Sequence, residues 1–91
     1  MIVVKLLRIH GRVQGIGYRY AMLVEATRIG LTGWVRNRMD GTVEAMVAGT
    51  KEEVERLIEW AKQGPRGAKV TRVDVEDAEG NFDSFEQIPS A

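Results

Sequence analysis

The chain has 91 residues, and 13 Lys and Arg are balanced by 13 Asp and Glu, so the formal net charge at pH 7 is zero. This length supports one domain with a single core, and a neutral chain has no net field that would attract nucleic acid or an anionic membrane. Cysteine is absent, which excludes a disulfide framework, a thiolate zinc site and a cysteine nucleophile. Lys5 and Arg8 interrupt the N-terminal apolar run too early for a signal peptide. We therefore expect a single domain over residues 1–91 that is cytoplasmic and monomeric.

Apolar residues in the first half of the chain predict a strand, a helix and a hairpin. Residues 2–10 are rich in Val, Leu and Ile, as a buried strand is, and residues 18–29 follow as a helix that Gly30 ends. A strand over residues 32–38, the turn Met39-Asp40-Gly41 and an alternating strand over residues 42–48 indicate a hairpin.

The second half predicts another helix and strand. Thr50-Lys51-Glu52-Glu53 has the pattern of a capping box, so a helix begins after Gly49 and Gly64-Pro65 ends it. Residues 69–76 alternate as a strand, residues 79–83 form a polar loop, and Phe82, Phe85 and Ile88 are suited to dock a short last strand. The order βαββαβ predicts an α+β, ferredoxin-like sandwich. Its four- to five-stranded sheet contains antiparallel strands and has two helices on one face.

This order predicts that two distant stretches meet. The hairpin places the third strand beside the second. The first and second strands run parallel and leave a gap between them, which the third strand fills. A right-handed crossover then brings the carboxyl ends of these two strands to the same edge of the sheet. We expect the loop around Gly15 to lie near Asn37.

The stretch I-H-G-R-V-Q-G-I-G-Y-R, residues 9–19, has the features of a phosphate-binding loop. It is expected to turn through Gly11, Gly15 and Gly17, which let backbone amides approach a ligand. Successive N–H groups and the helix start form an anion nest, and Arg19 adds a planar cation. The P-loop pattern G-x-x-x-x-G-K-[ST] is absent. The dinucleotide-binding pattern G-x-G-x-x-G fits Gly15 and Gly17, but Tyr20 stands where the third glycine is required. On spacing alone, a tight strand-to-helix connection with an exposed arginine explains the stretch equally well.

Two motifs resemble those of the acylphosphatase family. G-R-V-Q-G-I-G-Y-R, residues 11–19, is similar to the family's first signature, G-x-V-Q-G-V-x-F-R, with conservative departures at Ile16 and Tyr18. G-W-V-R-N-R-M-D-G-T-V-E-A-M-V-A-G, from Gly33 to Gly49, resembles the second signature at every defined position. The motifs come in the family's order, and the resemblance covers nearly the whole chain. It implies hydrolysis of the carboxyl–phosphate anhydride of an acyl phosphate to carboxylate and inorganic phosphate.

The resemblance also implies roles for individual residues. Arg19 matches the family's phosphate-binding arginine, and Asn37 matches the asparagine that orients the attacking water. The backbone that matches the phosphate loop is that of Gln14, Gly15, Ile16, Gly17, Tyr18 and Arg19. The implied ligands are a small acyl phosphate and inorganic phosphate, which competes with it, and no metal or other cofactor is implied. A phosphate oxygen would accept the proton of the water.

Two other functions are consistent with this sequence. The RNA-recognition fold is also βαββαβ, although it reads bases with aromatics on its first and third strands, and these strands have none here. A domain that binds an anion without turnover is the second alternative.

An asparagine before a hairpin is often only a turn former, which is the competing interpretation of Asn37. His10, the only histidine, matches no functional position of the motif, so we expect it to be structural or exposed.

Overall fold

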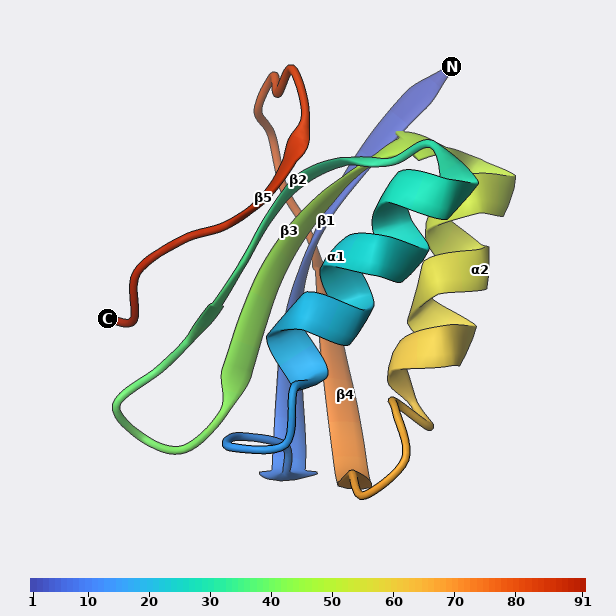
Figure 1. Cartoon of the computed structure of the whole chain (residues 1–91). Helices are drawn as coiled ribbons and strands as arrows, with labels where there is room; N and C mark the ends of the chain where they lie inside the picture. The colour runs from blue at the N-terminus through green and yellow to red at the C-terminus, as the bar shows by residue number, and fades with distance from the viewer.

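A computed structural model describes residues 1–91, with two helices packed on one face of a five-stranded sheet (Figure 1). The elements are β1 (Ile2–Arg12), α1 (Tyr18–Ile29), β2 (Thr32–Asn37), β3 (Val43–Thr50), α2 (Lys51–Ala61), β4 (Lys69–Asp77) and β5 (Phe85–Gln87). The predicted ferredoxin-like α+β fold is confirmed. Neither helix is long and apolar enough to cross a membrane.

The strand order brings the carboxyl ends of β1 and β2 to the same end of the sheet. The order across the sheet is β4-β1-β3-β2-β5. Because β3 pairs antiparallel with both β1 and β2, these two strands run parallel to each other on either side of it. The predicted gap between the first two strands is thus filled by the third. The short β5 adds to the outer edge of β2 in parallel.

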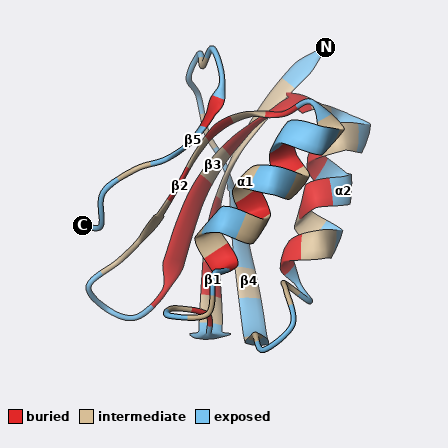
Figure 2. Ribbon diagram, viewed as in Figure 1, coloured by how far each residue is buried: buried red, intermediate tan, exposed pale blue.

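The core lies between the sheet and the helices. Along β3, Val43, Ala45 and Val47 are fully buried on the helix side, as a two-residue alternation requires. Figure 2 shows buried residues along this strand and on the inner faces of both helices. The helices contribute Tyr18, Met22, Ala26, Val54, Leu57 and Ala61. The predicted capping box begins α2, because the Thr50 hydroxyl accepts from the Glu53 N–H and the Glu53 carboxylate accepts from the Thr50 N–H.

The predicted end of the first strand is wrong by two residues. Gly11 was expected to be part of the glycine turn, but β1 continues through it to Arg12 and pairs with β4. A register shift between His10 and Gly11 brings the two strands so close that a Cβ on Gly11 would lie 2.0 Å from the Lys69 carbonyl oxygen. Gly11 therefore permits a bulge in the sheet and does not belong to the loop.

Other strand ends differ by one or two residues. β2 ends at Asn37 and not at residue 38, and β4 continues to Asp77. β3 runs from Val43 to Thr50, because its last residue still pairs with Ile2 of β1.

Candidate active site

A tight loop connects β1 to α1 at the end of the sheet where β2 also ends (Figure 1). Gly15 and Gly17 have positive φ angles of 78° and 81°, which residues with a Cβ adopt at a cost in free energy. Gly17 is the N-cap of α1. The prediction of a turn through these two glycines is confirmed.

The backbone N–H groups of this loop are free to bind a ligand. No side chain caps α1, and no N–H group from Gly15 to Tyr20 donates a hydrogen bond within the protein. The first turn contains no acidic residue, so nothing in it offsets the partial positive charge of the helix start. Unpaired N–H groups at a helix N-terminus suit an anion such as phosphate.

Arg19 places a full positive charge beside these N–H groups. It lies in the first turn of α1, is half-buried, and forms no ion pair. Arg8, Arg36 and Arg38 are each paired with a carboxylate, whereas Arg12, at the end of β1, is exposed and forms no ion pair. The Arg19 guanidinium therefore keeps its donors and its charge available for an anionic ligand.

Asn37 is the last residue of β2, and its side chain lies on the same side of the sheet as that of Val35, which is in the core. The backbone is held on both sides, because Asn37 pairs with Val43 and its carbonyl oxygen accepts from the Ala91 N–H at 3.0 Å. Its side-chain oxygen, Oδ1, is buried without a hydrogen-bond partner. Buried polar atoms nearly always have a partner, so this oxygen is an acceptor available to a ligand or water.

The loop contacts the hairpin directly after Asn37. The Gln14 side-chain nitrogen, Nε2, donates to the Arg38 carbonyl oxygen at 2.8 Å and to the Thr42 carbonyl oxygen at 2.9 Å. The structure therefore brings residues 14–19 and Asn37 together, although the loop leads into the start of α1 and Asn37 is the last residue of β2. The sequence predicted this proximity from the topology. It did not predict that the Gln14 side chain would make the contact.

Asp40 closes the hairpin turn. Its Oδ1 accepts from the Thr42 N–H at 3.0 Å and from the Thr42 hydroxyl at 2.6 Å. These two hydrogen bonds lower the pKa of the Asp40 carboxyl below its usual value. The turn that follows Asn37 is therefore ordered by an ionised side chain at neutral pH.

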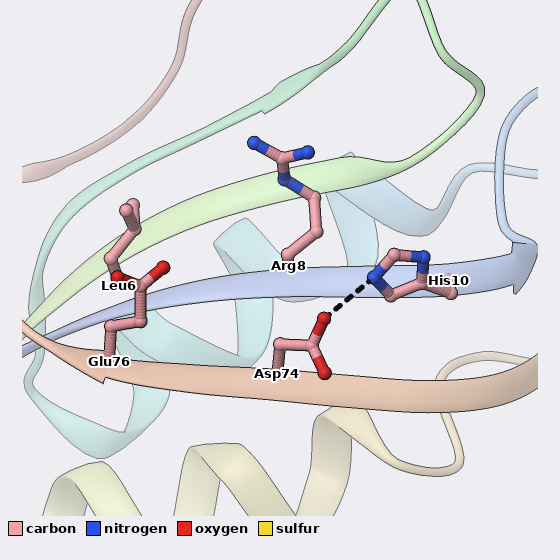
Figure 3. A pocket seen from close by; sticks show the side chains of 5 residues that line it. All are labelled: Leu6, Arg8, His10, Asp74 and Glu76. Atoms are coloured by element: carbon pink, nitrogen blue, oxygen red, sulfur yellow. Dashed lines mark hydrogen bonds and ion pairs between the residues drawn. The ribbon is translucent and has the colours of Figure 1, made fainter.

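The surface hollows of the protein are all lined by residues outside the loop. One of them lies on the face of the sheet opposite the core, and Figure 3 shows its lining residues: Leu6, Arg8, His10, Asp74 and Glu76. The His10 ring nitrogen Nε2 is 3.0 Å from Asp74 Oδ2 on this face. His10 thus points away from the face that carries the Asn37 side chain, which agrees with its expected structural role.

The sequence did not single out Glu44. This residue is only 6% exposed, although it lies on the face of the sheet without helices. It pairs with Arg36 at 2.8 Å, Arg38 at 3.4 Å and Arg8 at 3.5 Å. A carboxylate is buried at low cost only when it is paired in this way. The three arginines thus neutralise Glu44, and their charges are not free for a ligand.

A family model, Acylphosphatase, matches residues 5–87. An acylphosphatase of Thermococcus kodakarensis is 59% identical over 76 residues, which cover 81% of this chain and 84% of that protein. An acylphosphatase of Thiobacillus denitrificans is 54% identical over 81 residues, or 89% and 91% of the two chains.

The chain belongs to the acylphosphatase family. The crystal structure of the acylphosphatase from Bacillus subtilis has the same fold, with a TM-score of 0.90 and 33% identity over 97% of this chain and 99% of that chain. The protein is therefore a hydrolase that acts on acyl phosphates.

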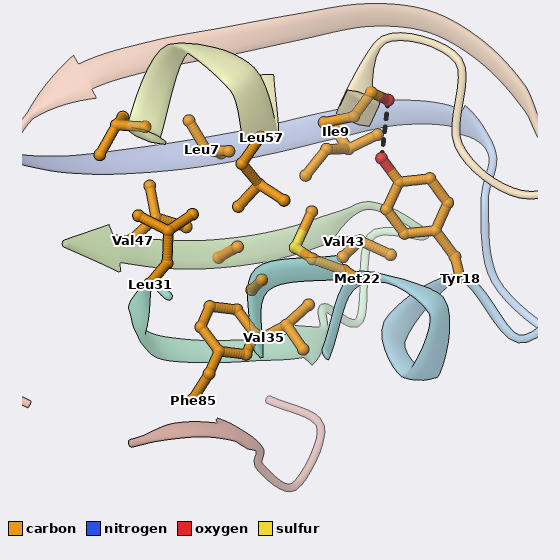
Figure 4. Packing of buried hydrophobic residues seen from close by; sticks show 14 of the residues in the cluster. Leu7, Ile9, Tyr18, Met22, Leu31, Val35, Val43, Val47, Leu57 and Phe85 are labelled. Carbon is orange, nitrogen blue, oxygen red and sulfur yellow. Dashed lines mark hydrogen bonds between the residues drawn. The ribbon is translucent and has the colours of Figure 1, made fainter. Parts of the chain in front are cut away.

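Tyr18 departs from the phenylalanine of the acylphosphatase signature, and the structure gives its hydroxyl a partner. The ring is buried with its centroid 5.5 Å from that of Trp60, and the hydroxyl donates to the Ala61 carbonyl oxygen at 2.7 Å (Figure 4). Burial raises the pKa of the Tyr18 phenol well above its usual value, so the hydroxyl keeps its proton and remains a donor. The bond joins the start of α1 to the last residue of α2.

We expect Tyr18→Phe to lower the stability of the protein. It removes one buried hydrogen bond and leaves the Ala61 carbonyl without its partner, which costs about 1–2 kcal/mol in the free energy of unfolding. In a chain of this size the melting temperature should fall by roughly 4–16 °C. Tyr20→Phe is the matched control. Tyr20 is 64% exposed, so this variant should melt at the same temperature as the parent protein. Equal melting of both variants would contradict a stabilising Tyr18 hydroxyl.

Proposed function

We propose that this acylphosphatase binds the phosphate of its substrate with Arg19 and the loop amides of residues 14–19, and that Asn37 orients the water that attacks it. The observation that carries the proposal is the set of unused groups at one end of the sheet. These are the free N–H groups from Gly15 to Tyr20, the unpaired Arg19 guanidinium and the buried Asn37 Oδ1. No other surface of the protein combines free donors, a free cation and a free buried acceptor in this way.

The negative charge of the substrate explains why these groups suit it. The phosphate of an acyl phosphate carries negative charge on its outer oxygens, and this charge is spread over them in the transition state of phosphoryl transfer. Loop N–H groups and a guanidinium fork stabilise such oxygens by fixed, charge-assisted hydrogen bonds. Because these donors are backbone groups of the loop and the helix start, they already point to one place before the substrate binds, so little reorganisation is needed when the reaction occurs.

The proposed reaction is a single in-line displacement. The oxygen of water forms a bond to phosphorus while the bond from phosphorus to the acyl oxygen breaks, and the electron pair leaves with the carboxylate. The Asn37 amide is neutral, so it accepts a hydrogen bond from the water but cannot remove its proton. The proton passes to a phosphate oxygen, and the products are a carboxylate and inorganic phosphate. The carboxylate is a good leaving group, so no general acid is required.

A hydrolysis assay on acetyl phosphate in excess chelator tests this proposal. We expect turnover to continue undiminished, because Arg19 and the loop amides carry the charge that a metal ion would otherwise neutralise. Activity that disappears with the chelator and returns with magnesium would contradict the mechanism. A phosphate monoester with a poor leaving group, assayed in parallel, should react far more slowly, because no acid protonates its departing oxygen.

Inorganic phosphate provides the binding control for the same assay. It should compete with acetyl phosphate and stabilise the folded protein, by about 2.7 kcal/mol at a hundredfold excess over its Kd. Competition by an RNA oligonucleotide without competition by phosphate would instead favour the RNA-binding alternative. The monomeric state, the cytoplasmic location and the absence of a nucleic-acid partner remain predictions from the sequence.

A further inference from the structure

The Gln14 side chain makes the only hydrogen bonds between the loop and the hairpin. Its Nε2 donates to the carbonyl oxygens of Arg38 and Thr42 at 2.8 and 2.9 Å. Both partners are carbonyls, which can only accept, so the nitrogen of the amide must face the hairpin and the orientation of the side chain is determined. Both N–H bonds of the Gln14 amide are used in this contact.

The two carbonyls lie at the base of the turn that follows Asn37. The Thr42 carbonyl also accepts from the Arg38 N–H at 2.8 Å, and the Arg38 carbonyl also accepts from the Gly41 N–H at 3.1 Å. The hairpin uses one lone pair of each oxygen, and Gln14 binds to each as a second donor. The amide is therefore attached to both sides of the turn, next to the last residue of β2.

The strands alone do not set the distance between the loop and Asn37. The loop follows β1 and Asn37 ends β2, and β3 lies between these strands, so they share no hydrogen bonds. Neighbouring strands are about 4.8 Å apart, so β1 and β2 are separated by roughly 10 Å. Asn37 itself is still paired with Val43, but the loop after β1 and the turn of residues 38–42 lie beyond the last paired residues. The relative position of the loop and the turn therefore depends on contacts between side chains and backbone, and Gln14 provides their hydrogen bonds.

We infer that Gln14 is a positioning residue, which holds the Asn37 hairpin at the correct distance from the phosphate-binding loop. This inference rests on the proposed function, because it assigns Gln14 an effect that is transmitted through Asn37. An attacking water must be in line with the departing oxygen, and a misplacement of about 1 Å can reduce the rate roughly a hundredfold. The Gln14 side chain is neutral and bound to the hairpin, so it should contribute little to phosphate affinity.

Gln14→Met tests the inference, because methionine has nearly the same length and volume but no N–H donor. We expect kcat on acetyl phosphate to fall roughly tenfold to a hundredfold, while KM and the Kd for inorganic phosphate stay within about threefold. Gln14→Asn keeps the amide but is one methylene too short, so it should not restore kcat. Gln63→Met is the matched control. Gln63 is exposed, so this variant should have normal activity. All assays are made well below the melting temperature of each variant, so that a loss of stability cannot reduce kcat.

A double-mutant cycle with Asn37→Ala shows whether the effect passes through Asn37. If Gln14 acts only by positioning Asn37, then Gln14→Met should reduce kcat by less than about twofold once Asn37 is alanine. Losses that multiply in the double variant would overturn the inference and leave the proposed function intact. Weaker phosphate binding by Gln14→Met, in proportion to the loss of kcat/KM, would also overturn it, because Gln14 would then be a phosphate ligand. Full activity of Asn37→Ala alone would overturn both the inference and the proposed function.

Discussion

Arg19→Ala should reduce the turnover of acetyl phosphate on the order of a hundredfold to a thousandfold, the loss expected when a transition-state donor is removed. Arg19 has no carboxylate partner in the protein, so its charge is not already used in an ion pair. Its removal leaves the loop N–H groups alone with the phosphate. Because a cation stabilises both the bound substrate and the transition state, the Kd for inorganic phosphate should also rise. Steady-state kinetics and calorimetric titration with phosphate measure the two effects.

Two further variants separate the geometry of Arg19 from its charge. Arg19→Lys keeps the charge but cannot bind two phosphate oxygens with a planar fork, so it should recover little of the lost rate. Arg12→Ala removes one positive charge from an exposed residue at the end of β1 that forms no ion pair, and it should change the rate little. If Arg12→Ala and Arg19→Ala reduced the rate equally, the effect would come from net charge, and the direct contact with phosphate would be wrong.

Asn37→Ala should reduce kcat steeply, with little change in KM or in phosphate affinity. This is the pattern of an interaction that is made in the transition state alone, because Asn37 is proposed to contact the water and not the phosphate. The variant should remain folded. Asn37 Oδ1 accepts no hydrogen bond in the protein, so its removal breaks none and relieves the burial of an unpaired polar atom. The melting temperature should be unchanged or slightly higher.

The control for this variant is Asn81→Ala, which alters the only other asparagine, in an exposed loop. It should have normal kinetics. A steep fall in the melting temperature of Asn37→Ala would indicate that the residue is mainly a turn former. Full activity of Asn37→Ala together with an inactive His10→Ala would mean that a base activates the water, and the role assigned to Asn37 would be wrong.

Local sequence patterns were sufficient to predict the elements and their order. The capping box at Thr50 to Glu53 and the glycines at positions 30, 15 and 17 act through the backbone of adjacent residues, so they can be recognised without knowledge of the fold. The predicted ends of the strands were less accurate than the predicted elements. β1 passes through Gly11 because β4 approaches it closely, and a contact between residues so far apart in the chain leaves no local pattern.

The proximity of the loop and Asn37 was also determined by the sequence, because the order of elements and the handedness of crossovers leave few ways to arrange the strands. Only the tertiary structure decided which side chains connect them. Gln14 binds carbonyls 24 and 28 residues away, the Tyr18 hydroxyl binds one 43 residues away, and Glu44 collects arginines from two other strands and the hairpin. Such bonds depend on the distance and direction between groups in space. Hydrophobic periodicity records only which face of an element is buried, so it contains no information about these partners.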